Sequence, residues 1–171
     1  MSDRMVFVTR MPAGIPGAVT RVEHATIEPQ QMDTGTPVTA YGVPVKHVAG
    51  LVQPIAAADV VANVFTGFIM RPYPTQSLVN EALGVMTPLL DQPVDELVRG
   101  YMTVKCNMAL SAKPAKDGIV YARKTDHGAG EYPIGGIESD ADSAKNEAIP
   151  HTFFTGPADS DGNVEISVRI K

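Results

Sequence analysis

The sequence predicts an all-β protein, a jelly-roll-like sandwich or barrel of short antiparallel strands preceded by an extended N-terminal arm. Fifteen glycines and fourteen prolines occur among the 171 residues, and both residue types interrupt helices and mark turns. Several segments alternate apolar and polar residues with the period of two that half-buried antiparallel strands require. Hydrophobic residues make up 44% of the chain, which is enough to fill the core of one domain of this length.

Residues 1–39 are expected to form the arm, and residues 40–171 a single β domain. Prolines divide the arm into pieces too short for a stable helix. The arm nevertheless carries more apolar side chains than a solvated linker would. We therefore expect it to lie along a surface, either that of its own β domain or that of a neighbouring subunit. Four of its apolar residues are candidate contacts with such a surface: Phe7, Met11, Ile15 and Ile27.

The first strands of the β domain are expected at residues 41–48 and 63–70. The segment 41–48 is rich in valine and contains a proline, which is typical of an edge strand. The segment 63–70 is mostly apolar and suits a buried strand, which two prolines within residues 71–75 then end. Arg71 and Tyr73 lie in this turn and are further candidate contacts, because Arg and Tyr are common interface anchors. The alternative is an ordinary turn that ends a strand.

An insert at residues 76–95 is the one place where the pattern favours a helix. Apolar residues occur at helical spacing in its first half, but Gly84 and Pro88 keep any helix short. We expect a loop with one or two helical turns.

The remaining segments predict antiparallel strands. Residues 100–108 alternate strictly: Met102, Val104, Cys106 and Met108 share one face, and Tyr101, Thr103, Lys105 and Asn107 share the other. We expect residues 118–124 to form a hairpin with this strand. Further strands are expected at 134–138, 149–155 and 164–171. The Asp-Gly pair within 159–163 is typical of a hairpin turn, and the spacing does not fit a calcium-binding loop.

Charge and composition exclude several function classes. The net charge of −5 and the sequence pI of about 5.3 argue against nucleic acid as a partner. The single cysteine, Cys106, rules out an intrachain disulfide and is expected to be a buried thiol. No apolar stretch has the length of a signal peptide or a membrane span. We therefore expect synthesis in the cytoplasm and no membrane partner.

No motif indicates catalysis, a cofactor or a metal. The four histidines are isolated from one another and from the cysteine, so they are expected to be ordinary polar surface residues. The acidic run at 138–142 is expected to be a solvated loop. There is no Gly-x-Ser-x-Gly, and no phosphate-binding loop. The sequence therefore predicts a protein that is not an enzyme and has no catalytic, cofactor-binding or metal-binding residues.

A set of segments in a particular order is similar to a known family. The segments are GIPG (14–17), TIEP (26–29), YGVPV (41–45), GFIMRPYP (67–74), RGYMTVK (99–105), GIVYAR (118–123), IGGIE (134–138) and FTGPAD (154–159). The ordered set resembles the structural cement, or head decoration, proteins of tailed bacteriophages over nearly the whole chain; the insert at 76–95 has no counterpart. The resemblance implies a non-catalytic protein on the outer capsid surface of a virion. It also implies binding across joints between major capsid proteins, assembly as a dimer or trimer, and no cofactor.

Two other functions fit a β domain of this kind. The first is a carbohydrate- or receptor-binding module on a virion surface, although the chain has no tryptophan and only 6% aromatic residues for stacking on sugars. The second is a small enzyme with a sandwich or cupin-like barrel, which would need a cluster of histidines and carboxylates that the spacing does not show. A glycan array tests the first alternative, and metal analysis of the purified protein tests the second.

Overall fold

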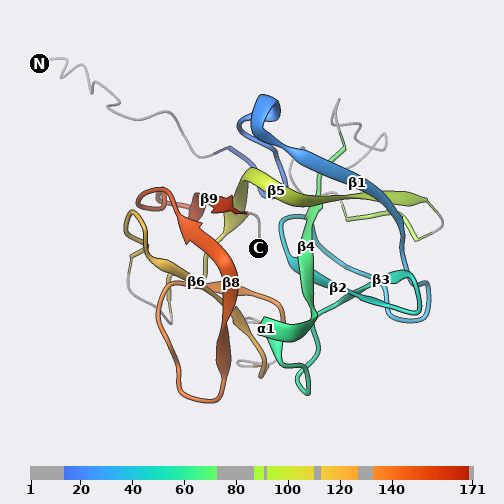
Figure 1. Cartoon of the computed structure of the whole chain (residues 1–171). Coiled ribbons are helices and arrows are strands. Elements are labelled where there is room, and N and C mark those ends of the chain that lie inside the picture. The colour runs from blue at the N-terminus through green and yellow to red at the C-terminus, as the bar shows by residue number, and fades with distance from the viewer. Residues whose placement is uncertain (1–13, 73–86, 91, 110–112, 127–132, 170–171) are drawn as a thin grey trace, which may run out of the picture.

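The computed structural model describes residues 14–72, 87–90, 92–109, 113–126 and 133–169, and within these residues it is almost entirely β (Figure 1). The predicted all-β class is confirmed. The strands are β1 (Thr26–Gln31), β2 (Pro44–Val48), β3 (Leu51–Pro54), β4 (Phe65–Met70), β5 (Pro93–Lys105), β6 (Ile119–Arg123), β7 (Ile137–Glu138), β8 (Asn146–Phe154) and β9 (Asn163–Val168). Two short helical turns, η1 (Val22–His24) and α1 (Val61–Val64), accompany them.

Strand β5 connects the two parts of the structure. The strands follow the order β3-β2-β4-β5-β9-β8-β6-β7, and β1 also pairs with β5. The first half of β5 pairs with β1 and β4, and its second half pairs with β9. Figure 1 shows the result, with β1 to β4 on one side, β6, β8 and β9 on the other, and β5 spanning both. We call these parts the N-terminal and the C-terminal half-sheet.

Each half-sheet curls until its ends meet. An isolated parallel bridge joins Met32 to Val52 in the N-terminal half-sheet, and another joins Cys106 to Ile137 in the C-terminal one. The amide N of Asp33 donates to the carbonyl O of Val52 at 3.0 Å, and the amide N of Asn107 donates to that of Ile137 at 2.8 Å. Curling in this way covers strand edges that would otherwise be open to pairing with other chains. The barrel-like architecture therefore consists of two small units that share one strand.

Two apolar clusters fill the structure. The smaller occupies the N-terminal half-sheet and includes Ile69, and the larger spans the C-terminal half-sheet and the junction and includes Phe68 and Leu97. Phe68 and Ile69 are adjacent in β4 and both are fully buried, so β4 is covered on both faces. Burial on both faces explains why the sequence of this strand is nearly continuous in apolar residues. The buried strand predicted at 63–70 is confirmed for its residues 65–70.

A glycine permits β5 to pass from one half-sheet to the other. Gly100 has a φ of +136° at the point where pairing changes from β1 and β4 to β9. A Cβ at this position would lie 3.0 Å from the Cα of Ala25 and 3.2 Å from the carbonyl O of His24. The bend and the close approach of the arm therefore both require a residue without a side chain.

The described part of the arm lies along the molecule's own β domain. The amide N of Gly17 donates to the carbonyl O of Thr103 at 2.8 Å. In return, the amide N of Thr103 donates to the carbonyl O of Ala18 at 2.9 Å. A further hydrogen bond of 3.0 Å runs from the amide N of Thr20 to the carbonyl O of Tyr101. Downstream, β1 pairs with the first half of β5. Residues 14–20, which we call the arm root, thus cover the second half of β5. The domain boundary at residue 39 stays a prediction.

Thr103 departs from the expected alternation of β5. It was predicted to share a solvent-facing side with Tyr101 and Lys105, but it is fully buried. The arm root pairs directly with Thr103 and covers the side that the pattern assigned to water. Met102, Val104 and Cys106 are buried as expected, and Met108 is half-buried.

Two predictions about strand pairing are wrong. Strand β2 is not an edge strand, because it lies between β3 and β4; its proline, Pro44, is the first residue, where a missing N–H is tolerated. Strand β6 does not form a hairpin with β5 but pairs with β7 and β8. The edges of the second half of β5 are already occupied by β9 and the arm root.

The strand at the C-terminus is paired as predicted, and β8 and β9 form a hairpin. The Oδ1 of Asp159 accepts bonds from the amide N of Asp161 at 2.9 Å and of Asn163 at 2.8 Å. This is a turn held by an aspartate side chain, as expected for the segment 159–163. In the predicted insert, residues 76–86 and 91 lie outside the described residues. Its end was placed wrongly, since β5 already begins at Pro93.

The acidic run at 138–142 is not simply a solvated loop, because Glu138 is 1% exposed. Its Oε1 lies 2.5 Å from the Nη1 of Arg123, which is also 1% exposed. Its Oε2 accepts a bond of 2.6 Å from the side-chain amide of Asn146. The run therefore supplies one half of a buried ion pair between β6 and β7.

We predict that Glu138→Gln lowers the free energy of unfolding by about 3–5 kcal/mol, because the buried guanidinium of Arg123 then keeps only the partly exposed carboxylate of Asp142, at 3.7 Å, as a countercharge. Glu147→Gln is the matched control. Glu147 pairs with Lys124 at 3.1 Å on a partly exposed surface, so its loss should cost less than about 1 kcal/mol. Urea unfolding of the two variants measures the difference. Equal losses of unfolding free energy would show that the buried Arg123–Glu138 pair stabilises the protein no more than the partly exposed Lys124–Glu147 pair.

We predict that Gly17→Ala destabilises the protein more than Gly50→Ala. Both glycines have similar positive φ values, +85° and +83°, so both variants carry a backbone cost of about 1–2 kcal/mol. A Cβ at Gly17 would lie 2.5 Å from the Cβ of Tyr41, whereas a Cβ at Gly50 would meet nothing within 4 Å. Urea unfolding midpoints separate the two contributions. Identical losses would mean that the arm root is not tightly packed.

Candidate interaction site

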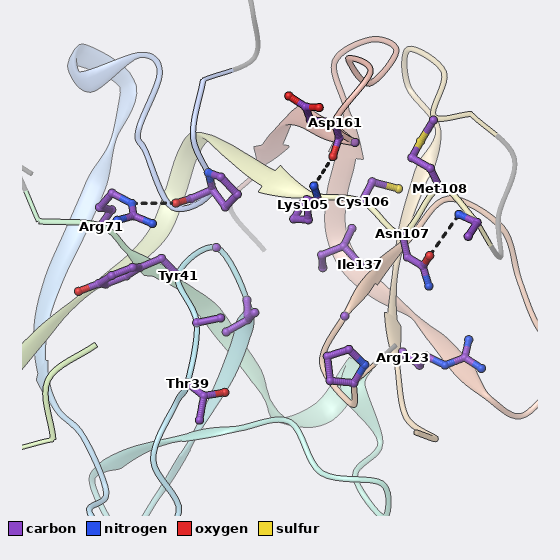
Figure 2. A pocket seen from close by; sticks show the side chains of 18 of the residues that line it. Thr39, Tyr41, Arg71, Lys105, Cys106, Asn107, Met108, Arg123, Ile137 and Asp161 are labelled. Atoms are coloured by element: carbon purple, nitrogen blue, oxygen red, sulfur yellow. Dashed lines mark hydrogen bonds between the residues drawn. The ribbon is translucent and has the colours of Figure 1, made fainter. Parts of the chain in front are cut away.

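A groove of about 570 Å³ opens between the two half-sheets beside the end of β5 (Figure 2). Tyr41 and Arg71 form its wall on the N-terminal half-sheet, and Lys105 to Ala109 form the facing wall. Pro16 of the arm root lies at its rim. Figure 2 shows the two walls with an open space between them. The groove is therefore bounded by both half-sheets and by the arm.

Arg71 holds the arm root against the N-terminal wall. It is 5% exposed, and its Nε donates to the carbonyl O of Pro16 at 3.2 Å. Its guanidinium lies 4.6 Å from the centre of the Tyr41 ring, a cation–π contact. Burial lowers the pKa of Arg71, and the negative charge that Tyr41 would carry partly offsets this. Burial raises the pKa of Tyr41, and the positive charge of Arg71 counteracts this. Both side chains are thus packed structural parts of the groove wall.

The opposite wall combines a buried thiol with a short turn. Cys106 is buried, as predicted, and Lys105 Nζ donates to the carbonyl O of Asp161. None of the described residues that line the groove is a histidine. Across the described ranges, no group of three or more His, Cys, Asp or Glu side chains is placed to hold a metal ion. A groove with apolar walls and few charges is suited to packing against another chain.

A second cluster fastens the arm to β9. The Oε1 of Glu165 accepts a bond of 2.6 Å from Thr20, and its Oε2 accepts bonds of 2.8 Å from Arg21 and 2.7 Å from Thr155. The Arg21 guanidinium also lies 4.0 Å from the centre of the Tyr101 ring. Burial raises the pKa of Glu165, but the bonds from Thr155, Thr20 and Arg21 outweigh it and lower the pKa below its usual range. Glu165 therefore stays ionised and holds the arm.

The structure places the candidate contact residues in different surroundings. Phe7, Met11 and Tyr73 lie outside the described residues. Ile15 is half-buried and adjoins Pro16, which Arg71 contacts. Ile27 is 37% exposed on β1, away from the groove. Arg71 is buried, so it shapes the wall and does not project into solvent.

Sequence reasoning missed the residues that fasten the arm. Glu165 belongs to the last strand, 144 residues from Arg21, and no local pattern connects the two. Tyr41 was considered only as part of a strand. His47 is isolated in the sequence, yet its Nε2 lies 2.7 Å from Oε2 of the fully buried Glu96. These pairings arise only when distant strands come together.

The fold is similar to that of a chain in a solved phage capsid structure. A solved chain from a structure titled "The capsid of Myoviridae Phage XM1" aligns with a TM-score of 0.66 and 15% sequence identity, over 99% of this chain and 98% of that one. A comparison with curated proteins found no match. Within the described ranges, no helix is long and apolar enough to cross a bilayer.

A family model described as XM1 gp53 minor capsid protein matches residues 5–168. The chain belongs to the XM1 gp53 minor capsid protein family. It is therefore a capsid-associated structural protein of a phage virion, which confirms the family resemblance found in the sequence.

We predict that Glu165→Gln destabilises the protein by about 1.5–3 kcal/mol at neutral pH, since it weakens charged hydrogen bonds. The folded pKa of Glu165 lies below that of the unfolded chain, which is about 4.3 for glutamate. The stabilisation is therefore fully present well above pH 4.3 and is lost as the pH falls through the folded pKa. The stability difference between wild type and variant should shrink below about pH 4.3.

Unfolding free energies between pH 7 and pH 3 check this prediction. Asp117→Asn is the control, because Asp117 is 69% exposed and lies 3.9 Å from Arg169; it should change stability little at any pH. A difference between wild type and Glu165→Gln that stays constant across this range would contradict the assigned role of the carboxylate.

Proposed function

We propose that this protein is a non-enzymatic decoration, or cement, protein. It binds the outer surface of the phage head across joints between major capsid proteins and stabilises them. Membership of a minor capsid protein family supports a capsid role. The observation that carries the cement role is the way the arm root, which directly follows residues 1–13 in the sequence, is fastened to β5.

A bridge across a joint must keep its own parts together under load. Backbone hydrogen bonds join the arm root to Tyr101 and Thr103, and the Glu165 cluster follows directly after it. A pull on residues 1–13 must therefore break several bonds together before the arm separates. The load passes into β5, the strand that both half-sheets share. The geometry suits a protein that holds on to a partner by its N-terminal segment.

Residues 1–13 have the composition of a segment that binds in an extended form. Phe7 and Met11 are the candidate anchors, and Pro12 limits the conformations of the free segment. Such restriction lowers the entropy cost of ordering on binding. Ile15 and Ile27 add apolar contacts nearer the β domain, and Tyr73 is a further candidate. Arg71 acts indirectly by holding the arm root.

The proposed partner is the major capsid protein, and the protein itself is expected to form a dimer or trimer. Several weak contacts on a symmetric lattice gain strength from multivalency. A homo-oligomer on the capsid would present more than one arm, so each copy could engage a different capsid subunit. No cofactor, nucleic acid or membrane takes part in this proposal.

We predict that deletion of residues 2–13 reduces occupancy on phage heads at least tenfold and leaves the unfolding temperature unchanged. The deletion stops before the arm root because residues 14–20 cover Thr103 and pair with β5. Purified protein is co-sedimented with heads that lack it, and bound copies are counted by gel. Wild type should saturate at a fixed stoichiometry.

A paired substitution sharpens this test. Phe7→Ala with Met11→Ala should lower occupancy, whereas the control Thr9→Ala in the same segment should not. Unchanged occupancy of the deletion variant would refute the arm as the capsid contact. Absence of wild-type binding together with a positive glycan array would favour the carbohydrate- or receptor-binding alternative.

A further inference from the structure

A second hollow, of about 370 Å³, lies where η1, the bend of β5 and the end of β9 meet. The residues that line it are Arg21, His24, Arg99, Gly100, Tyr101, Ser167, Val168 and Arg169. Three are arginines and none is acidic, although the whole chain has a net charge of −5. We propose that this arginine hollow binds a carboxylate-bearing segment of a partner protein on the capsid. The inference rests on the proposed function and names the chemistry of one contact.

Two arginines lie at the end of the ladder between β5 and β9. The ladder ends at the pair Gly100–Val168, and Arg99 and Arg169 are the next residues of the two segments and line the same hollow. Like charges that share a hollow repel one another. In the described part of the chain, no carboxylate oxygen lies within 4 Å of the guanidinium nitrogens of Arg99. An anionic group from outside would relieve this repulsion.

Glu165 neutralises Arg21 at 2.8 Å, but Arg99 and Arg169 have no such close carboxylate partner among the described residues. Asp117 lies 3.9 Å from Arg169, and both side chains are more than 60% exposed, so the contact contributes little. Arg99 and Arg169 also line the neighbouring hollow, together with Glu28 and Glu96. Glu96 is paired there with His47 at 2.7 Å, and among the described residues no ion pair joins either glutamate to Arg99 or Arg169. Arg99 and Arg169 therefore remain available for a ligand.

Two of the three arginines, Arg21 and Arg169, are held in place by aromatic rings. The Arg169 guanidinium lies 4.7 Å from the centre of the Phe153 ring, and that of Arg21 lies 4.0 Å from the centre of Tyr101. Their side chains are still 61% and 46% exposed. Stacking restricts the side chains and lowers the entropy cost of binding. Arg21 already holds Glu165, so Arg99 and Arg169 are the recognition residues and Arg21 is a positioning residue.

A carboxylate suits this hollow better than a nucleic-acid backbone. Guanidinium groups form two parallel hydrogen bonds with one carboxylate. A polyanionic duplex would meet a chain that carries an overall charge of −5. The occupant is therefore a short protein segment that contains Asp or Glu.

The test uses the full-length chain and a polyglutamate peptide as the probe, with binding followed by titration at low and at physiological salt. Wild type should bind, more weakly as salt rises. Arg99→Gln combined with Arg169→Gln should weaken binding at least tenfold. Lys113→Gln combined with Lys116→Gln is the matched control: it removes the same charge at exposed positions outside the hollow and should stay within twofold of wild type.

Two results would overturn the inference. One is equal binding by wild type and the arginine variant, with unfolding temperatures confirming that both are folded. The other is tighter binding of a short DNA duplex that is lost in the same variant, which would assign the hollow to phosphate. Because the peptide titration requires no phage heads, a failed head-binding assay would count against the proposed function without deciding this contact.

Discussion

The pairing of β5 is the constraint on which the rest of the structure depends. A thirteen-residue strand has more edge than one small barrel can use, and every unpaired backbone group would have to be satisfied elsewhere. The molecule divides the strand at Gly100, pairs its first half with β1 and β4, and pairs its second half with β9 and the arm root. Both half-sheets are thereby joined through a continuous backbone, without a linker between them.

The same arrangement explains why the arm root is packed as part of the β domain. Residues 14–20 complete the edge of β5 and bury Thr103, and Arg71 and Glu165 secure them from either side. The groove and the arginine hollow both adjoin this fastened segment, because Pro16 lines one and Arg21 lines the other. Contacts made by residues 1–13 and by the arginine hollow would therefore act on one rigid junction.

The arginines near this junction fall into two groups, one buried and one exposed. Arg71 and Arg123 are buried and hold structure, the first over Tyr41 and the second against Glu138. Arg99 and Arg169 are exposed beside a bend that only glycine permits. This acidic protein thus has a local basic surface where its arm meets its β domain.

The sequence by itself determined the β class, the buried strand at β4, the faces of Met102, Val104 and Cys106, and the turn before β9, because these follow from local periodicity and turn chemistry. It also carried the family resemblance. Only the tertiary structure decided that β6 pairs with β8, that Thr103 is buried and that Glu165 holds Arg21. Those pairings join residues far apart in the chain. Their partners are chosen by which edges and charges remain unsatisfied after folding, and local patterns do not contain that information.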